Sequence, residues 1–321
     1  MIKLQGSSNE NFVVLGLGRS GMTSARALNA SGANVICWDD DPEKRSLASS
    51  QGLRVIGSVS DFDWESIDRL IISPGVPHHF PLPHPIVSAA VSAGVLIDND
   101  VGLFFQSIAT KSWDKFSVRP RIVAVTGSNG KSTTASLLHH IFLKLGYKSQ
   151  LAGNIGRGVL DIDPPENNEL IVLELSSYQI EVARILSPDL AIFTNFSADH
   201  LERHGGIGGY LAAKRRLFTE GCPDYSIIGV DELAGLNLAQ QLSASIGDES
   251  IIRVSATKQM RRFDWSIFLD AGYLVEHRKG KQINSTDLKV FDNFVGPHSY
   301  QNAASACLLY TSDAADEVVG V

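Results

Sequence analysis

The sequence predicts a parallel α/β protein made of two domains. Apolar strand-like segments alternate along the chain with glycine-rich turns and amphipathic helix-like segments, which is the pattern of parallel α/β layers. The length of 321 residues corresponds to about two domains. A fresh strand–loop–helix pattern begins near residues 117–121, where Pro120 precedes an apolar run. We therefore expect one small α/β domain over residues 1–117 and a larger one over residues 118–306.

The first domain should contain three strands and two helices that the pattern marks clearly. The expected strands are Phe12–Leu15, Asn34–Trp38 and Leu70–Ser73. The expected helices are Ser20–Ala30 and Val87–Ala93, because Gly32 and Gly94 follow them as C-terminal stops.

The second domain should begin with a strand and end in an antiparallel segment. The expected strands are Ile122–Thr126, Leu170–Leu175, Leu190–Asn195, Ser226–Val230 and Ile251–Val254. Residues 265–288 predict two or three short antiparallel strands, with turns at Asp270–Gly272 and Lys279–Lys281.

Composition excludes several classes of protein. Hydrophobic residues make up 44% and charged residues 20%, which argues against intrinsic disorder. The net charge of −7 would repel phosphate backbones, so we expect no nucleic-acid partner. Three scattered cysteines favour a reducing cytosolic compartment over a disulfide framework. The start of the chain lacks a signal pattern, and no apolar run approaches the ~20 residues that span a bilayer, so we expect no membrane insertion.

The first glycine-rich loop, Gly16–Gly21, has the spacing G-x-G-x-x-G between a strand and a helix. Glycine at these positions allows a tight turn and lets a pyrophosphate approach the helix N-terminus. Asp39 follows the next strand, where a ribose-binding acid lies in dinucleotide folds. The loop predicts a phosphate-containing ligand. By itself it leaves NAD open, and a turn that serves only packing is the alternative.

The second glycine-rich loop, Thr126–Thr133, reads TGSNGKST and also joins a strand to a helix. Backbone N–H groups of such a loop wrap phosphates, Lys131 adds positive charge, and the Ser132 hydroxyl can bind Mg²⁺. The strict P-loop pattern has glycine where Val125 stands. We interpret the loop as a nucleoside triphosphate site for ATP, which a dehydrogenase would not need.

Three titratable residues downstream are candidates for catalysis. Glu174 ends an apolar strand, and a carboxylate there can hold Mg²⁺ directly or through water. His200 follows Asp199 after the next strand and could be a metal ligand or a base; a structural or solvated histidine is the alternative. Lys214 lies in a helical pattern, where most lysines are merely solvated.

Five segments in order carry a family resemblance: TGSNGKST (126–133), AGNIG (152–156), LELSSYQIE (173–181), NFSADH (195–200) and AAK (212–214). Together they closely resemble the Mur ligases of bacterial peptidoglycan synthesis, over roughly residues 10–306. The LELSSYQ stretch and the GLGRSG loop resemble the members that join D-glutamate to UDP-N-acetylmuramoyl-L-alanine.

The resemblance implies a Rossmann-like UDP-binding domain, a central P-loop ATPase domain and a set of site residues. It assigns to the UDP-substrate Gly18, Arg19, Ser20, Asp39, Ser73, Pro74, Gly75, Asn154, Ser176 and Gln179. It assigns to ATP Gly127, Ser128, Asn129, Gly130, Lys131, Ser132, Thr133 and Asn302, the last in a segment that closes over adenine. Catalysis falls to Lys131, Glu174, His200 and Lys214, and two Mg²⁺ ions to Ser132, Glu174, His200 and a carbamylated Lys214.

The implied reaction is a two-step ligation. The carboxylate of UDP-N-acetylmuramoyl-L-alanine attacks the γ-phosphorus of ATP, and the amine of D-glutamate then displaces phosphate from the acyl phosphate. The resemblance also implies a cytoplasmic bacterial enzyme of cell wall biogenesis, acting in cell shape and division. We expect it to be a monomer.

The end of the chain departs from the family. Mur ligases carry a third, C-terminal Rossmann-like domain of about 150 residues, and we expect that domain to be missing here. Residues 307–317 (CLLYTSDAADE) resemble a translated sequencing adapter, so we interpret residues 307–321 as a non-native tail and expect the chain alone to be inactive as a ligase. Ser299 and Gly102 stand where the family usually has Asn and Glu.

Three alternative interpretations of the function remain open. Another Mur-type or a folylpolyglutamate-type ligase would share the P-loop and the lysine, but LELSSYQ argues against both. An NAD(P)-dependent oxidoreductase could use the first loop, but the P-loop argues against it. A non-catalytic nucleotide-binding fragment is the third alternative.

Overall fold

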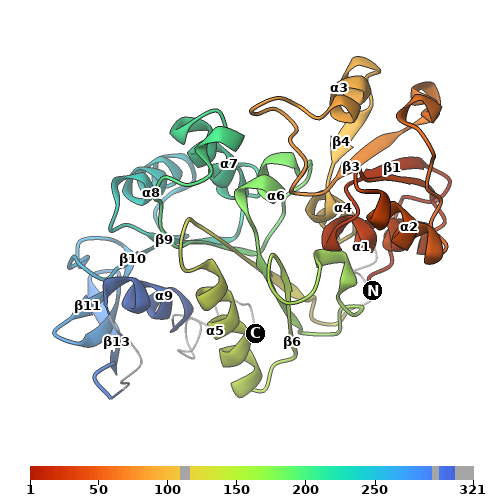
Figure 1. Ribbon diagram of the computed structural model, residues 1–321. Coiled ribbons are helices and arrows are strands. Elements are labelled where there is room, and N and C mark those ends of the chain that lie inside the picture. The colour runs from red at the N-terminus through yellow and green to blue at the C-terminus, as the bar shows by residue number, and fades with distance from the viewer. Residues whose placement is uncertain (109–115, 291–295, 308–321) are drawn as a thin grey trace.

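A computed structural model describes residues 1–108, 116–290 and 296–307, whose strands form two sheets (Figure 1). The first sheet has four strands in the order β2-β1-β3-β4, and the second has nine in the order β13-β12-β11-β10-β9-β8-β5-β7-β6. The strands of the first sheet are β1 (Asn11–Leu15), β2 (Asn34–Trp38), β3 (Arg69–Ile72) and β4 (Leu96–Asp98). Those of the second are β5 (Arg121–Thr126), β6 (Ser149–Gly153), β7 (Leu170–Glu174), β8 (Leu190–Phe193), β9 (Tyr225–Gly229), β10 (Ile251–Ser255), β11 (Trp265–Asp270), β12 (Tyr273–Arg278) and β13 (Lys281–Asp287).

Helices cover both sheets. The α-helices are α1 (Arg19–Ala30), α2 (Pro42–Ser50), α3 (Pro85–Ser92), α4 (Asp100–Ile108), α5 (Lys131–Lys144), α6 (Ser177–Val182), α7 (Ile207–Thr219), α8 (Leu233–Ile246) and α9 (Pro297–Cys307). Short 3₁₀ helices are η1 (Val59–Asp61), η2 (Trp64–Ser66), η4 (Val159–Asp161) and η5 (Leu201–Arg203). In the second domain α5 and α9 pack on one face of the sheet, and α7 and α8 lie on the other (Figure 1). No helix in the described ranges is both long and apolar enough to cross a membrane.

The first sheet is parallel and is centred on β1, which pairs with β2 and β3. Residues 12–15 are all buried, as expected of a central parallel strand that is covered on both faces. Since the strands run the same way, the loop after β1 and the turn after β3 emerge at the same edge of the sheet. That edge is where open α/β sheets bind ligands.

The second sheet is parallel from β6 through β11 and ends in an antiparallel meander. Its strand β5 pairs with β7 on one side and β8 on the other. The loops after these three strands therefore meet at one carboxyl edge. At the far side, β11 pairs in parallel with β10 and antiparallel with β12, and β13 completes the edge.

The predicted α/β class and every strand predicted from the pattern are confirmed, with ends that differ by at most two residues. Three of the elements that were not predicted have weak patterns: α2 buries only Ala48, β4 has three residues, and β6 is half-buried along Ser149–Leu151. Helices α4, α6 and α8 were not predicted either, although α4 buries seven of its nine residues. The domain boundary at residue 117 stays a prediction. Of the predicted tail, residues 308–321 lie outside the described residues.

The two domains share an interface. Helix α4 of the first packs against α6 of the second, and α1 packs against η4. Asn99 donates from its side-chain amide to the Gln179 carbonyl at 2.7 Å across this interface.

Candidate active site

The second glycine-rich loop connects β5 to α5, and two of its glycines lie where no side chain would fit. Gly127 has φ +142° and Gly130 has φ +79°, both in the region that favours glycine. A Cβ on Gly127 would lie 2.0 Å from Thr194 Oγ1, and one on Gly130 would lie 2.2 Å from Asn302 Oδ1. Asn302, predicted from the resemblance as an ATP residue, thus lies directly against the phosphate loop.

The segment that follows β8 holds this loop in place through hydrogen bonds. The Asn129 N–H donates to Asn195 Oδ1 at 2.9 Å, and the Asn195 amide donates back to the Asn129 carbonyl at 3.0 Å. The Ser128 N–H donates to the Asn195 carbonyl at 2.9 Å. Sequence reasoning gave Asn195 no role, although an amide directly after a buried apolar strand was a usable signal.

Lys131 lies over the loop that precedes it. Its ammonium donates to the carbonyls of Gly127 at 3.1 Å and Ser128 at 2.8 Å. Burial lowers the pKa of Lys131, while the negative charges of Glu174 and Asp199 act in the opposite direction. The lysine therefore sits where a phosphate on the loop would meet it.

Glu174 and Ser132 form an oxygen-donor pair beside the loop. The Ser132 hydroxyl donates to Glu174 Oε2 at 2.9 Å, and the Glu174 residue is 1% exposed. A buried carboxylate next to a hydroxyl fits Mg²⁺, which binds through one or two protein oxygens together with phosphate oxygens. Within the described ranges, no cluster of three or more His, Cys, Asp or Glu could hold a metal by itself.

His200 is the N-cap residue of η5 and has a positive φ of 49°, and its side chain is about half exposed. Its Nε2 lies 3.3 Å from Asp199, and its ring centroid lies 5.4 Å from that of Tyr178. These contacts do not join it to the Ser132–Glu174 pair, so its role as a metal ligand stays a prediction.

Lys214 is a buried lysine rather than the solvated one that its pattern favours. It is 1% exposed and donates to the Gly127 carbonyl at 2.7 Å. Burial lowers its pKa to about 7, with a further contribution from the positive charge of Lys131. Tyr210, which sequence reasoning did not single out, places its ring 4.5 Å from the Lys214 ammonium and its hydroxyl 3.2 Å from Ser128 Oγ.

A cavity of about 480 Å³ lies at the carboxyl edge of the first sheet. It is lined by Leu15, Gly16, Gly18, Arg19, Ser20, Asp39, Asp40, Lys44, Ser73, Pro74, Gly75, Val76, Pro77 and His84. All seven residues predicted for the first domain line it. A Cβ on Gly18 would meet no atom within 4 Å, so the backbone there is open to a ligand. Lys44 and His84 are cavity residues that the sequence did not reveal.

Asp39 holds the first glycine-rich loop in place. Its Oδ2 accepts from the Leu17 N–H at 2.6 Å, and its Oδ1 accepts from the Asp41 N–H at 2.9 Å. Lys44 lies 3.5 Å from Oδ2. Direct contact of Asp39 with a ligand stays a prediction.

Three predicted substrate residues belong to the second domain and have structural partners. Ser176 and Gln179 form a reciprocal capping box at the start of α6, and Gln179 is 2% exposed. The Asn154 carbonyl accepts from Arg19 Nη2 at 2.9 Å, which ties the loop after β6 to the first glycine-rich loop. Whether these side chains contact a substrate stays a prediction.

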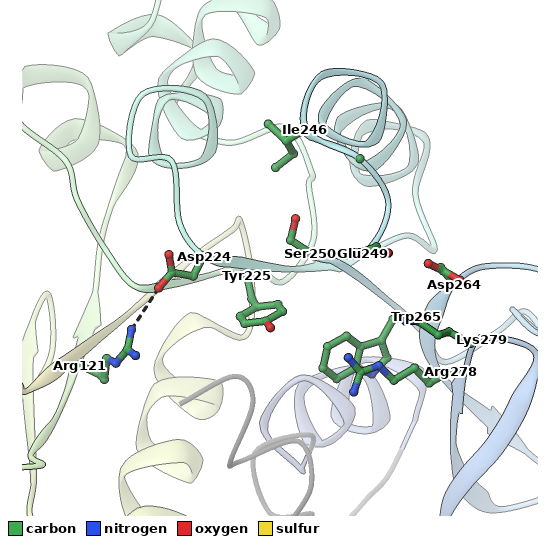
Figure 2. Close-up of a pocket in the computed structure, with 11 residues that line it drawn as sticks. Arg121, Asp224, Tyr225, Ile246, Glu249, Ser250, Asp264, Trp265, Arg278 and Lys279 are labelled. Atoms are coloured by element: carbon green, nitrogen blue, oxygen red, sulfur yellow. Dashed lines mark hydrogen bonds and ion pairs between the residues drawn. The ribbon is translucent and has the colours of Figure 1, made fainter. Parts of the chain in front are cut away.

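A second cavity, of about 570 Å³, lies at the amino-terminal ends of the parallel strands of the second sheet, and Figure 2 shows residues that line it. It is lined by the first residues of β5, β9 and β11, which are Arg121, Tyr225 and Trp265. Arg121 pairs there with Asp224 at 3.1 Å. Because parallel sheets bind ligands at their carboxyl ends, this amino-end cavity is separate from the phosphate site.

Family comparisons agree with this geometry. Residues 125–310 match the Mur ligase middle domain, and residues 10–98 match the Mur ligase MurD-like N-terminal domain. The chain belongs to the Mur ligase family.

Two curated relatives share the name UDP-N-acetylmuramoylalanine–D-glutamate ligase. The one from Cereibacter sphaeroides (strain KD131 / KCTC 12085) is 54% identical over 306 residues, which covers 95% of this chain and 66% of the relative. The one from Roseobacter denitrificans is 54% identical over 308 residues, with the same shares. The chain thus spans just under two thirds of these relatives.

Solved structures show the same fold. The ligase Mpl from Neisseria meningitides has a TM-score of 0.57 at 16% identity, covering 98% of this chain and 95% of that one. A UDP-N-acetylmuramoyl-L-alanyl-D-glutamate–2,6-diaminopimelate ligase has a TM-score of 0.53 at 19% identity, covering 99% of this chain and 61% of that one. At these identities the likeness concerns the fold alone.

Proposed function

We propose that the protein is an ATP-dependent ligase that adds D-glutamate to UDP-N-acetylmuramoyl-L-alanine, releasing ADP and phosphate. The 54% identity to relatives of that name is the observation that carries the proposal. The geometry supports it, because each domain carries one phosphate-type loop. Arg19 of the first loop donates across the interface to Asn154, whose side-chain amide lies 3.4 Å from the Glu174 carboxylate beside the second loop.

The cavity of the first domain is the proposed UDP site. Its backbone is open at Gly18, and α1 begins at the next residue, so the helix N-terminus faces a diphosphate there. Lys44 and Arg19 line the same cavity and supply positive charge. The muramoyl-alanine end of the substrate then extends toward the second domain.

The loop between β5 and α5 is the proposed ATP site. Its N–H groups and Lys131 bind the β- and γ-phosphates, and Lys131 neutralises charge as the substrate carboxylate attacks the γ-phosphorus. The C–O–P bond of an acyl phosphate forms, and ADP leaves with the electron pair of the broken P–O bond.

Ser132 and Glu174 would hold Mg²⁺, which when bound neutralises phosphate charge. Lys214 is suited to carbamylation, because only a neutral amine attacks CO₂ and its pKa of about 7 leaves much of it neutral. The carbamate is an anion, so with His200 it would complete a second cation site.

In the second step the D-glutamate amine attacks the acyl carbonyl and phosphate leaves. The amine must be held about 3 Å from that carbonyl. We propose that the part of the relatives beyond this chain does so, and hence that a 321-residue polypeptide binds both nucleotides without ligating. The protein would act as a cytoplasmic monomer in the synthesis of peptidoglycan precursors.

A nucleotide panel and a ligation assay test the proposal. Calorimetry on the 321-residue chain should show binding of UDP-N-acetylmuramoyl-L-alanine and of Mg·ATP, and none of NAD. The full-length protein should incorporate labelled D-glutamate, with equimolar ADP, and should leave L-glutamate unused. Binding of NAD in place of the UDP-sugar would favour an oxidoreductase. Incorporation of D-glutamate by the 321-residue chain would show that the acceptor site is misplaced.

A further inference from the structure

One arginine of the second domain reaches the turn that lines the cavity of the first domain. Arg203 lies in η5, three residues after His200, and its guanidinium reaches across the domain interface. Nη1 donates to the Gly75 carbonyl at 3.1 Å, and Nη2 donates to the Val76 carbonyl at 3.0 Å. Both carbonyls belong to the turn that lines the first-domain cavity. The two parallel bonds use the planar fork that lysine lacks.

The turn that Arg203 grips is itself part of the phosphate loop assembly. Ser73 opens the turn, and its hydroxyl donates to the Gly16 carbonyl at 2.7 Å. A Cβ on Gly16 would lie 2.9 Å from the Ser73 Cβ, so the turn and the first glycine-rich loop are closely packed. A movement of this turn therefore moves the wall of the proposed UDP site.

The same guanidinium also packs against an aromatic stack of the second domain. The Arg203 guanidinium lies 4.9 Å from the centre of the Tyr178 ring. His204 stacks on the same ring at 5.2 Å with an interplanar angle of 13°. The Tyr178 ring also lies 5.4 Å from the His200 ring. His200, the proposed metal residue, and Arg203 thus both pack against the Tyr178 ring.

His204, which follows η5, is held against α6, the helix that carries Tyr178. Its side chain is fully buried, with Nε2 2.9 Å from Ser177 Oγ and Nδ1 2.8 Å from Glu181 Oε2. The order serine–histidine–glutamate also occurs in hydrolases, but Ser177 is only 3% exposed, so here it is a structural brace. Glu181 lies 3.7 Å from His78 of the first domain as well, which adds a second link across the interface.

We propose that Arg203 is a positioning residue that couples the two nucleotide sites, so that a ligand in the first-domain cavity and Mg·nucleotide on the P-loop strengthen each other's binding. The inference rests on the proposed function. Interfaces between domains of one chain are mobile by default, and a ligand that orders a shared interface lowers the cost of ordering it for the other. Arg203 connects the turn that lines the proposed UDP site to the segment that contains His200. Ordering of the interface by one ligand would therefore reach the other site through this side chain.

Calorimetry on the 321-residue chain tests the coupling. The dissociation constant of UDP-N-acetylmuramoyl-L-alanine is measured alone and with saturating Mg²⁺ and a non-hydrolysable ATP analogue. We expect the analogue to tighten binding of the unsubstituted chain at least about fivefold. The ratio of the dissociation constants without and with the analogue should fall to about 1 in Arg203→Gln. In Arg203→Lys this ratio should be intermediate. Arg262→Gln, at an exposed arginine far along the chain, should keep the full ratio.

The outcomes separate the inference from the function on which it rests. If the unsubstituted chain binds no UDP-sugar, the proposed function is wrong. If it binds but its ratio is 1, or if Arg203→Gln keeps the full ratio, the inference is wrong. Hydrogen exchange on the unsubstituted chain gives a readout that needs no variant to fold. UDP-sugar alone should slow amide exchange in residues 199–206, and unchanged exchange there would also overturn the inference.

Discussion

Replacing Lys214 by methionine should remove a large pH dependence from the stability of the second domain. The lysine is 1% exposed, and burial lowers its pKa from 10.5 to about 7. The folded state therefore binds this proton less readily than the unfolded state. Between about pH 7 and pH 10.5 the unfolded chain carries the extra proton, so stability rises with pH across that window. The loss of stability that comes from burying this lysine is complete below about pH 7 and absent above about pH 10.5.

The magnitude follows from the two pKa values. Between about pH 8 and about pH 9 the unfolded lysine is almost fully protonated and the folded one almost fully neutral. One proton of difference gives a slope of about 1.4 kcal/mol per pH unit, so this residue should contribute about 1.3 kcal/mol across that interval. Methionine has a similar length and no charge, so the variant should lack this slope.

Urea unfolding in CO₂-free buffer at several pH values measures the effect. The free energy of unfolding of the unsubstituted chain should rise with pH relative to that of Lys214→Met. Lys144→Met, at an exposed position of α5, controls for the loss of one ammonium. Parallel pH profiles for the unsubstituted chain and Lys214→Met would refute the conclusion that the lysine is buried as a neutral amine.

Three further substitutions test the phosphate loops. Lys131→Ala in the full-length protein should abolish acyl-phosphate formation, seen as loss of ADP release, because the charge at the γ-phosphate is gone; normal turnover would contradict the ATP site. Asp39→Ala should weaken UDP-sugar binding about tenfold, since a loop N–H loses its acceptor at a cost of about 1–3 kcal/mol, and calorimetry should still show no NAD binding. Gly130→Ala should destabilise the chain by more than the ~1–2 kcal/mol of a left-handed alanine, because its Cβ would lie 2.2 Å from Asn302 Oδ1. Gly146→Ala has a similar φ of +87° and no atom within 4 Å, so equal melting temperatures for the two variants would argue against the clash.

Much of the fold was predictable because buried parallel strands leave a strong local pattern. Residues 12–15 and 170–173 are continuous apolar runs, and they lie in β1 and β7, two strands that have a neighbour on each side. Helix α2 was missed because only one of its residues is buried, so its sequence carries little periodicity. Strand β6 was missed for the same reason, as its first three residues are only half-buried.

The site could be predicted at positions where the backbone or a close contact allows only one residue type. Glycine at positions 127 and 130 is required by φ and by contact, and this requirement is visible as a motif. Asn195, Tyr210 and Arg203 form hydrogen bonds with groups that lie from 66 to 128 residues away in the chain. No local pattern encodes such pairs. The burial of Lys214 is likewise a tertiary property, and its helical pattern alone favours a solvated lysine.

The Gly127 carbonyl links the two lysines of the proposed site and gives carbamylation a second consequence. It accepts from Lys214 at 2.7 Å and from Lys131 at 3.1 Å, so two amines converge on one oxygen. Mutual repulsion contributes to the low pKa of Lys214. A carbamate keeps one N–H for this carbonyl but carries a negative charge, so the repulsive pair becomes an attractive one. Carbamylation of Lys214 should then raise the pKa of Lys131 and hold it as the cation that the γ-phosphate requires. An NMR titration of the lysine ammonium signals with and without CO₂ measures this directly, and an unchanged Lys131 titration would argue against the link.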